Sequence, residues 1–198
     1  MSATSAPFGM RPAFHPSGLD RAQALAGGIP SAFNTDIFKG QPVRYQTTAI
    51  GGTLGTITPA TTSGAWSGAF AGVQWTDTTG RARVSNYWPA NTAYTTGSCV
   101  AYFYNDANIV YEIQADGSMA QTTIGNEFTF TNVTVGSTTT GLSQCTLGSA
   151  TAVGNGNPGQ MRVVDIAPYP GNDWGDAYTI VRVVNSQSQF FGTVNAIG

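Results

Sequence analysis

Charge is the property that this sequence most lacks. Only 9% of its 198 residues are Asp, Glu, Lys or Arg, against roughly 25% in an ordinary soluble domain. Lysine occurs once, as Lys39, and the net charge is −2 with no basic run. These features argue against nucleic-acid binding by phosphate neutralisation. The surface must consist mainly of hydroxyl, amide and backbone groups, which suits copies packed side by side and is also common in secreted β-proteins.

Cysteine and long apolar runs are scarce as well. Cys99 and Cys145 lie far apart without metal-ligand spacing, and Cys99 sits in an apolar run where a free thiol acts as a small hydrophobe. Two reduced thiols are therefore favoured over a single disulfide. No stretch approaches the roughly 20 apolar residues of a membrane helix, and the N-terminus lacks a signal-peptide pattern. We expect a protein that binds no membrane and is made in a reducing cytoplasm.

Motifs that carry chemistry are few. Asn172, Asp173 and Asp176 form one polar loop that could supply oxygen ligands to Ca²⁺ or the acid and base of a glycosidase. The loop lacks further carboxylates, and Trp174 alone does not make a sugar cleft, so a structural turn is favoured. A Ser-His-Asp triad would need His15, the only histidine, which lies in an irregular segment unsuited to catalytic geometry. We expect no enzyme, no cofactor and no metal.

The first 40 residues differ from the rest of the chain. Three prolines among the first 16 residues interrupt regular backbone hydrogen bonding, while Phe8, Met10 and Phe14 are too apolar for a solvated tail. The segment 1–40 therefore predicts an extended N-terminal arm that orders against a partner, with a short helix at 19–26. The expected interface residues of this arm are Phe8, Met10, Arg11, Pro12, Phe14 and His15.

From residue 41 onward the pattern is typical of β-structure. Strands are expected at 42–46, 69–75, 81–88, 98–104, 108–114, 127–135, 161–166, 178–184 and 190–197. The Thr- and Gly-rich stretch 47–63 fits a weak edge hairpin or a long loop. We expect 98–104 and 108–114 to pair as a hairpin, and a bulge near Thr131 to correct a phase change. The sequence predicts an all-β fold, with a single barrel or sandwich domain over 41–198.

Four stretches resemble virion structural proteins of tailed phages that are encoded near the major capsid gene. They read SATSAPFGMRPAFHPSG at 2–18, FAGVQWTDTTGR at 70–81, YEIQADG at 111–117 and TTTGLS at 138–143. The resemblance implies a decoration, or cement, protein on the outer surface of the virion head, synthesised in the host cytoplasm. Such a protein binds the major capsid protein, fastens neighbouring capsomers and often associates with itself as a homotrimer.

The aromatic residues leave a second interpretation open. Trp66, Trp75, Trp88, Trp174 and the tyrosines could form the platform of a glycan- or receptor-binding module in the head, neck or tail. Most of them lie in strand patterns, which favours packing in a core or a subunit interface.

Overall fold

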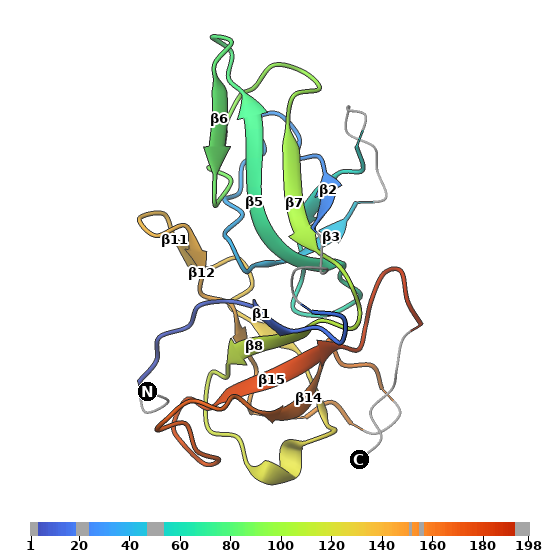
Figure 1. Ribbon diagram of the computed structural model, residues 1–198, viewed down its shortest axis with the longest axis vertical. Coiled ribbons are helices and arrows are strands. Elements are labelled where there is room, and N and C mark those ends of the chain that lie inside the picture. Colours follow the sequence, from blue (N-terminus) through green and yellow to red (C-terminus); the bar gives the residue numbers. More distant parts are fainter. Residues whose placement is uncertain (1–3, 19–23, 47–53, 151, 155–156, 193–198) are drawn as a thin grey trace.

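Residues 4–18, 24–46, 54–150, 152–154 and 157–192 are those that the structure, a computed structural model, describes. These residues are almost all β, with one 3₁₀ turn and no α-helix, and the strands form several antiparallel sheets (Figure 1). The all-β prediction is confirmed. No closed barrel forms in the described ranges, and a sandwich fits the arrangement. None of the described residues forms a helix able to cross a bilayer.

One sheet, which we call the β8 sheet, has five antiparallel strands. Their order is β1 (Arg11–Phe14), β8 (Val110–Gln114), β15 (Ile180–Asn185), β14 (Met161–Ile166) and β9 (Glu127–Phe128). Two short pairs accompany it, β10 (Phe130–Thr131) with β13 (Thr146–Leu147) and β11 (Gly136–Ser137) with β12 (Leu142–Ser143). The 3₁₀ turn Gln121–Thr123 lies on the connection from β8 to β9.

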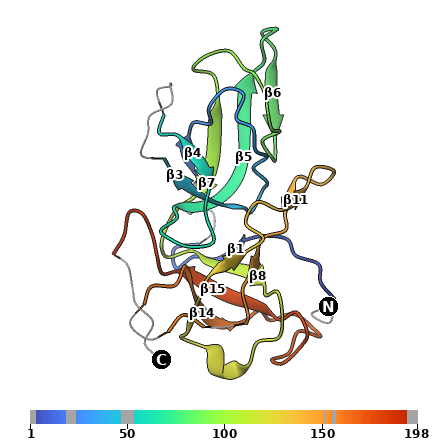
Figure 2. The same cartoon turned by 180° about the vertical axis from the view of Figure 1, so that it is seen from behind.

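The second sheet, the β5 sheet, has six strands. Its order is β2 (Leu25–Gly27), β7 (Val100–Tyr104), β5 (Gly68–Thr76), β3 (Pro42–Tyr45) and β4 (Ile57–Pro59), while β6 (Ala82–Ser85) also pairs with β5. Within the stretch 47–63, β4 lies at the sheet edge and pairs with β3, which precedes the stretch, while 47–53 lies outside the described residues. Figure 2 shows β3 and β4 beside each other from the back.

Each sheet has its own apolar core. The β8 core includes Met10, Trp66, Tyr111, Ile113, Phe128, Phe130, Cys145, Leu147, Met161, Val163, Val181 and Val183. The β5 core includes Ile29, Ile37, Val43, Ile57, Phe70, Val73, Trp88, Cys99, Ala101 and Phe103. Both cysteines are buried and free, as the sequence favours. Because alternate residues of a strand face opposite sides, β7 contributes Ala101 and Phe103 and β15 contributes Val181 and Val183, at every second position.

Strand β5 links the two cores. Ala69 belongs to the β8 core and the next residue, Phe70, to the β5 core, and the strand curves down toward the β8 sheet (Figure 1). Gly68 begins this strand where the backbone of β7 comes close. A Cβ at Gly68 would lie 1.9 Å from the carbonyl oxygen of Tyr104, so only glycine fits without a shift of the backbone.

The hairpin predicted for 98–104 and 108–114 is wrong. Strand β7 pairs with β2 and β5, whereas β8 pairs with β1 and β15, so the turn between them carries the chain from one sheet to the other. Phe103 fills the β5 core and Tyr111 the β8 core. The continuous apolar pattern reflects two central strands in different sheets, which local pairing rules cannot distinguish from a buried hairpin.

Three further local predictions need correction. Leu25 and Ala26, the end of the predicted helix, belong with Gly27 to strand β2, which pairs with β7, and 19–23 lies outside the described residues. The phase change in 127–135 comes from a turn and not from a bulge, because β10 ends at Thr131, Asn132 has a φ of +53° and the Val135 amide donates to the Asn132 carbonyl. Phe190–Gly192 is not in a strand, and the rest of the predicted final strand lies outside the described part.

Candidate protein-binding site at the N-terminal segment

The N-terminal segment lies on the chain's own β8 sheet. Strand β1 pairs antiparallel with β8, with Arg11 opposite Glu112 and Pro12 opposite Tyr111. Met10 is only 2% exposed and belongs to the β8 core. The expectation that the apolar groups of 1–40 find their burial on another polypeptide is therefore corrected for Met10, and for Ile29 and Ile37, which fill the β5 core.

Two glycines allow this close attachment. Gly9 and Gly40 both have positive φ, +70° and +81°, and the Met10 amide donates to the Gly40 carbonyl over 2.8 Å. A Cβ at Gly9 would come within 2.7 Å of both the Gly40 oxygen and the Ser143 Cβ. The Phe8-Gly9-Met10 sequence thus fits a tight contact between the N-terminal segment and residues 39–41.

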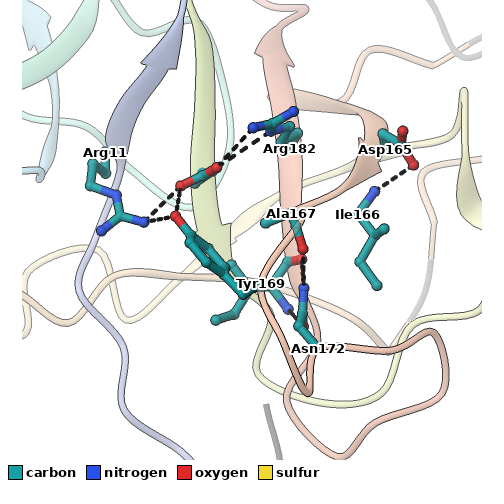
Figure 3. Close-up of polar contacts among 9 residues, drawn as sticks. Arg11, Asp165, Ile166, Ala167, Tyr169, Asn172 and Arg182 are labelled. Atoms are coloured by element: carbon teal, nitrogen blue, oxygen red, sulfur yellow. Dashed lines mark hydrogen bonds and ion pairs between the residues drawn. The ribbon is translucent and has the colours of Figure 1, made fainter. Parts of the chain in front are cut away.

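A buried carboxylate holds β1 in place. Glu112, on β8, is 3% exposed and accepts from Arg11 Nη2 at 2.7 Å and from Arg182 Nε at 3.3 Å. Tyr169 donates its hydroxyl to Glu112 and accepts from Arg11. Figure 3 shows Arg11 and Arg182 on opposite sides of the cluster, with the Tyr169 hydroxyl on the same side as Arg11. The cluster therefore ties together β1, β8, β15 and the loop after β14.

The charge balance of this cluster keeps Glu112 ionised. Burial alone raises the pKa of Glu112, but the hydrogen bonds from Tyr169 and Arg11 and the attraction of Arg11 outweigh it, so the pKa is lowered overall. Burial and the neighbouring Glu112 charge raise the pKa of Tyr169. At neutral pH the carboxylate is a permanent anion and the phenol keeps its proton. This arrangement suits a structural ion-pair cluster better than proton transfer.

His15 is a second attachment point. It is 8% exposed, its Nε2 lies 3.0 Å from Asp106 Oδ2, and its Nδ1 accepts from the Ser17 amide at 3.1 Å. The bond from Ser17 implies that the proton of the neutral ring is on Nε2, which then donates to Asp106. Both ring nitrogens are thus engaged, and neither is left to activate a nucleophile as a triad requires.

A pocket of about 430 Å³ lies beside β1, and we call it the β1 pocket. It is lined by Phe8, Met10, Arg11, Pro12, Lys39, Gly40, Phe70, Tyr104 and Leu142. Its volume falls within the roughly 300–1,000 Å³ typical of ligand pockets. Four of the six predicted interface residues line it. Of the other two, Phe14 is 53% exposed on β1, and His15 is buried against Asp106.

The Asn172 loop is engaged in structural contacts. The Asn172 side chain donates to the carbonyls of Ala167 and Ile180 and accepts from the Ile180 amide, all within 2.9 Å; Figure 3 shows Asn172 against Ala167. Asp176 accepts from the Asp173 amide. No group of three His, Cys, Asp or Glu side chains able to hold a metal occurs in the described ranges. Asn172 is thus the hydrogen-bonded centre of a turn, with no free oxygen to offer a cation.

The comparisons with known proteins give no further guide. A scan of protein-family models found no match, and searches of curated proteins and solved structures found no significant match. The description of the candidate site therefore depends on the structure of this chain alone.

Sequence reasoning found the segment but missed its partners. Lys39, Tyr104 and Leu142 lie far from residues 8–12 in the sequence, and only the fold brings them together. Glu112 was the one signal of a partner in the sequence, because it is a lone acid in an otherwise apolar run. A charged side chain is buried only when it is paired. The identity of that partner, Arg11, needed the register of β1 on β8.

Proposed function

We propose that this protein is a non-enzymatic decoration protein of a tailed-phage head, which binds the major capsid protein lattice from outside and stabilises it. The observation that carries the proposal is the state of the N-terminal segment, which also carries the resemblance to phage virion proteins. Met10 and Arg11 fasten it to the β8 sheet, yet Phe14 stays 53% exposed and Phe8 and Pro12 line an open pocket. Rigidly held apolar groups of this kind suit an interface with another protein.

The distribution of charge supports the same function. Arg11, Arg83, Arg162 and Arg182 are each paired with a carboxylate of the chain itself, and Glu127 of the Arg162 pair is fully buried. Few charges remain on the surface to repel a neighbouring copy. Large apolar side chains are exposed at Phe14, Leu25, Leu54, Val84, Ile124, Val135, Leu142, Val164, Phe190 and Phe191. Dense packing on a lattice would cover many of them.

Self-association follows from the same proposal. In a closed ring, each copy contacts the next through a heterologous interface, and the rotation between neighbouring copies adds up to a full turn. The resemblance implies a homotrimer. Because the protein would bind the assembled lattice and not its free subunits, its binding free energy would stabilise the shell by mass action. The molar mass of the purified protein, measured by analytical ultracentrifugation, tests the trimer separately from head binding.

The glycan-binding alternative has less support. Trp66 and Trp88 are fully buried, Trp75 packs edge-on against Trp88 at 5.6 Å, and Trp174 packs against the β8 core. The tryptophans therefore serve mainly as core residues. A glycan array probed with the purified protein tests this alternative, and specific binding would favour it.

A cryo-EM map of the intact particle tests the proposed function. We expect copies of this fold on the outer face of the head, in contact with the major capsid protein through the N-terminal segment. A map that places the protein only in the tail or neck, or a particle that lacks it, would overturn the proposal.

A further inference from the structure

The β1 pocket combines an apolar wall with positive charge. Phe8, Met10, Pro12, Phe70, Tyr104 and Leu142 supply the wall, and Arg11 and Lys39 are the charged residues. No carboxylate of the described residues lines it. A partner that fills this pocket must have apolar groups, and its charge complements the pocket best if it also carries a negative group.

Lys39 is the first of the two cations. It is the only lysine of the chain and is exposed, and its ammonium makes no hydrogen bond or ion pair with any residue that the structure describes. Its backbone, in contrast, is fixed on both sides, because the Lys39 amide donates to Gly141 and its carbonyl accepts from Ser143, both at 2.9 Å. A free ammonium on a well-held backbone is suited to receive an external anion.

Arg11 is the second cation. Its Nη2 bonds to Glu112 and Tyr169, and its guanidinium lies over the Phe8 ring, 5.1 Å from the ring centre. Its Nε and Nη1 have no partner among the described residues. Arg182 shares the charge of Glu112, so Glu112 does not neutralise both guanidiniums. Arg182 lies outside the pocket lining, which among the described residues holds two cations, Arg11 and Lys39, and no carboxylate.

The open edge of β1 limits how a partner can enter. Strand addition beside β1 would need backbone donors, but Pro12 has none, and the Met10 amide is already bonded to Gly40. The loss of these two donors favours a partner that docks by its side chains. The match in charge and polarity favours a polypeptide segment in which Asp or Glu lies close to an aromatic or aliphatic residue.

We propose that the β1 pocket is the docking site for such an acidic segment, with its carboxylate on Lys39 and Arg11 and its apolar side chain against Tyr104 and Leu142. The inference rests on the proposed function for the source of the segment, which is the major capsid protein. It adds the chemistry of the contact and the residues that make it.

Zero-length cross-linking tests this contact directly, because the chain has a single lysine. Heads that lack the protein are incubated with the purified full chain and a water-soluble carbodiimide, which joins an amine to a carboxylate in direct contact. We expect an amide between Lys39 Nζ and an Asp or Glu of the major capsid protein, identified by peptide mass spectrometry. Lys39→Arg should keep head binding, because it keeps the charge, and should lose the cross-link.

Head binding by charge variants completes the test. Lys39→Glu should weaken binding about tenfold or more, because it places like charges in contact. Arg81→Glu is the matched control: it makes the same change in net charge at another exposed cation, one outside the pocket. If wild type binds heads without forming a Lys39 cross-link, and Lys39→Glu binds equally well, the pocket proposal is wrong and the decoration function stands. If wild type itself does not bind heads, the proposed function fails, and the pocket proposal fails with it.

Discussion

Replacing Met10 with alanine should destabilise the folded protein. Its side chain is 2% exposed in the β8 core, and a truncation of this kind in a core costs about 2–5 kcal/mol. For a chain of this size, 1 kcal/mol corresponds to roughly 2–4 °C in Tm, so a fall of about 4–20 °C is expected. Phe14→Ala is the internal comparison: Phe14 is in β1 but 53% exposed, so its loss should change stability by about 0.5 kcal/mol or less.

Urea unfolding followed by tryptophan fluorescence measures both variants, since Trp66 shares the β8 core with Met10. The transition midpoint of Met10→Ala should fall while that of Phe14→Ala stays near wild type. Head binding should show the reverse order under conditions where both variants are folded, with Phe14→Ala the weaker binder. Equal midpoints for the two variants would refute the packing of the N-terminal segment on its own sheet.

Three further predictions follow from the site. Glu112→Gln should lower the unfolding free energy at pH 7 by about 1–3 kcal/mol; because the folded-state pKa of Glu112 is lowered, wild type loses this advantage as the pH falls below about 4, and urea midpoints that failed to converge there would contradict it. Gly9→Ala should cost about 1–3 kcal/mol by the same assay, since φ is +70° and the new Cβ would meet Gly40 and Ser143; an unchanged midpoint would show that the segment is not held there. Ca²⁺ should leave the Tm of wild type and of the Asp173→Asn, Asp176→Asn double variant unshifted in calorimetry, because Asn172 is bonded to backbone; a rise in wild type alone would reveal an ion site.

The strands with clear alternation were predictable from the sequence, and their partners were not. Met161–Ile166 and Ile180–Asn185 form β14 and β15 close to the expected positions, because apolar residues at every second position need one buried face. The separation of β7 from β8 could not be predicted, because it depends on long-range pairing with β2, β5 and β15. The strand at Leu25–Gly27 was not predicted for the same reason, because its pairing with β7 overrides a weak helical preference.

Only the N-terminal part of the candidate site was predictable from the sequence. The prolines and aromatic residues of the first 16 residues predict a segment without a core of its own; in the structure Phe14 is exposed, and Phe8 and Pro12 are half-buried. Composition could not tell that Met10 would be buried in the β8 core, because an apolar residue looks the same whether its own chain or a partner covers it. Likewise, nothing local marks Lys39 as the cation of a pocket.

The most direct test of the central claim is a sedimentation assay with purified protein and heads that lack it. We expect wild-type protein to pellet with the heads to saturation, and excess protein to remain in the supernatant. Protein that stays entirely in the supernatant at all ratios, while folded by circular dichroism, would contradict the account.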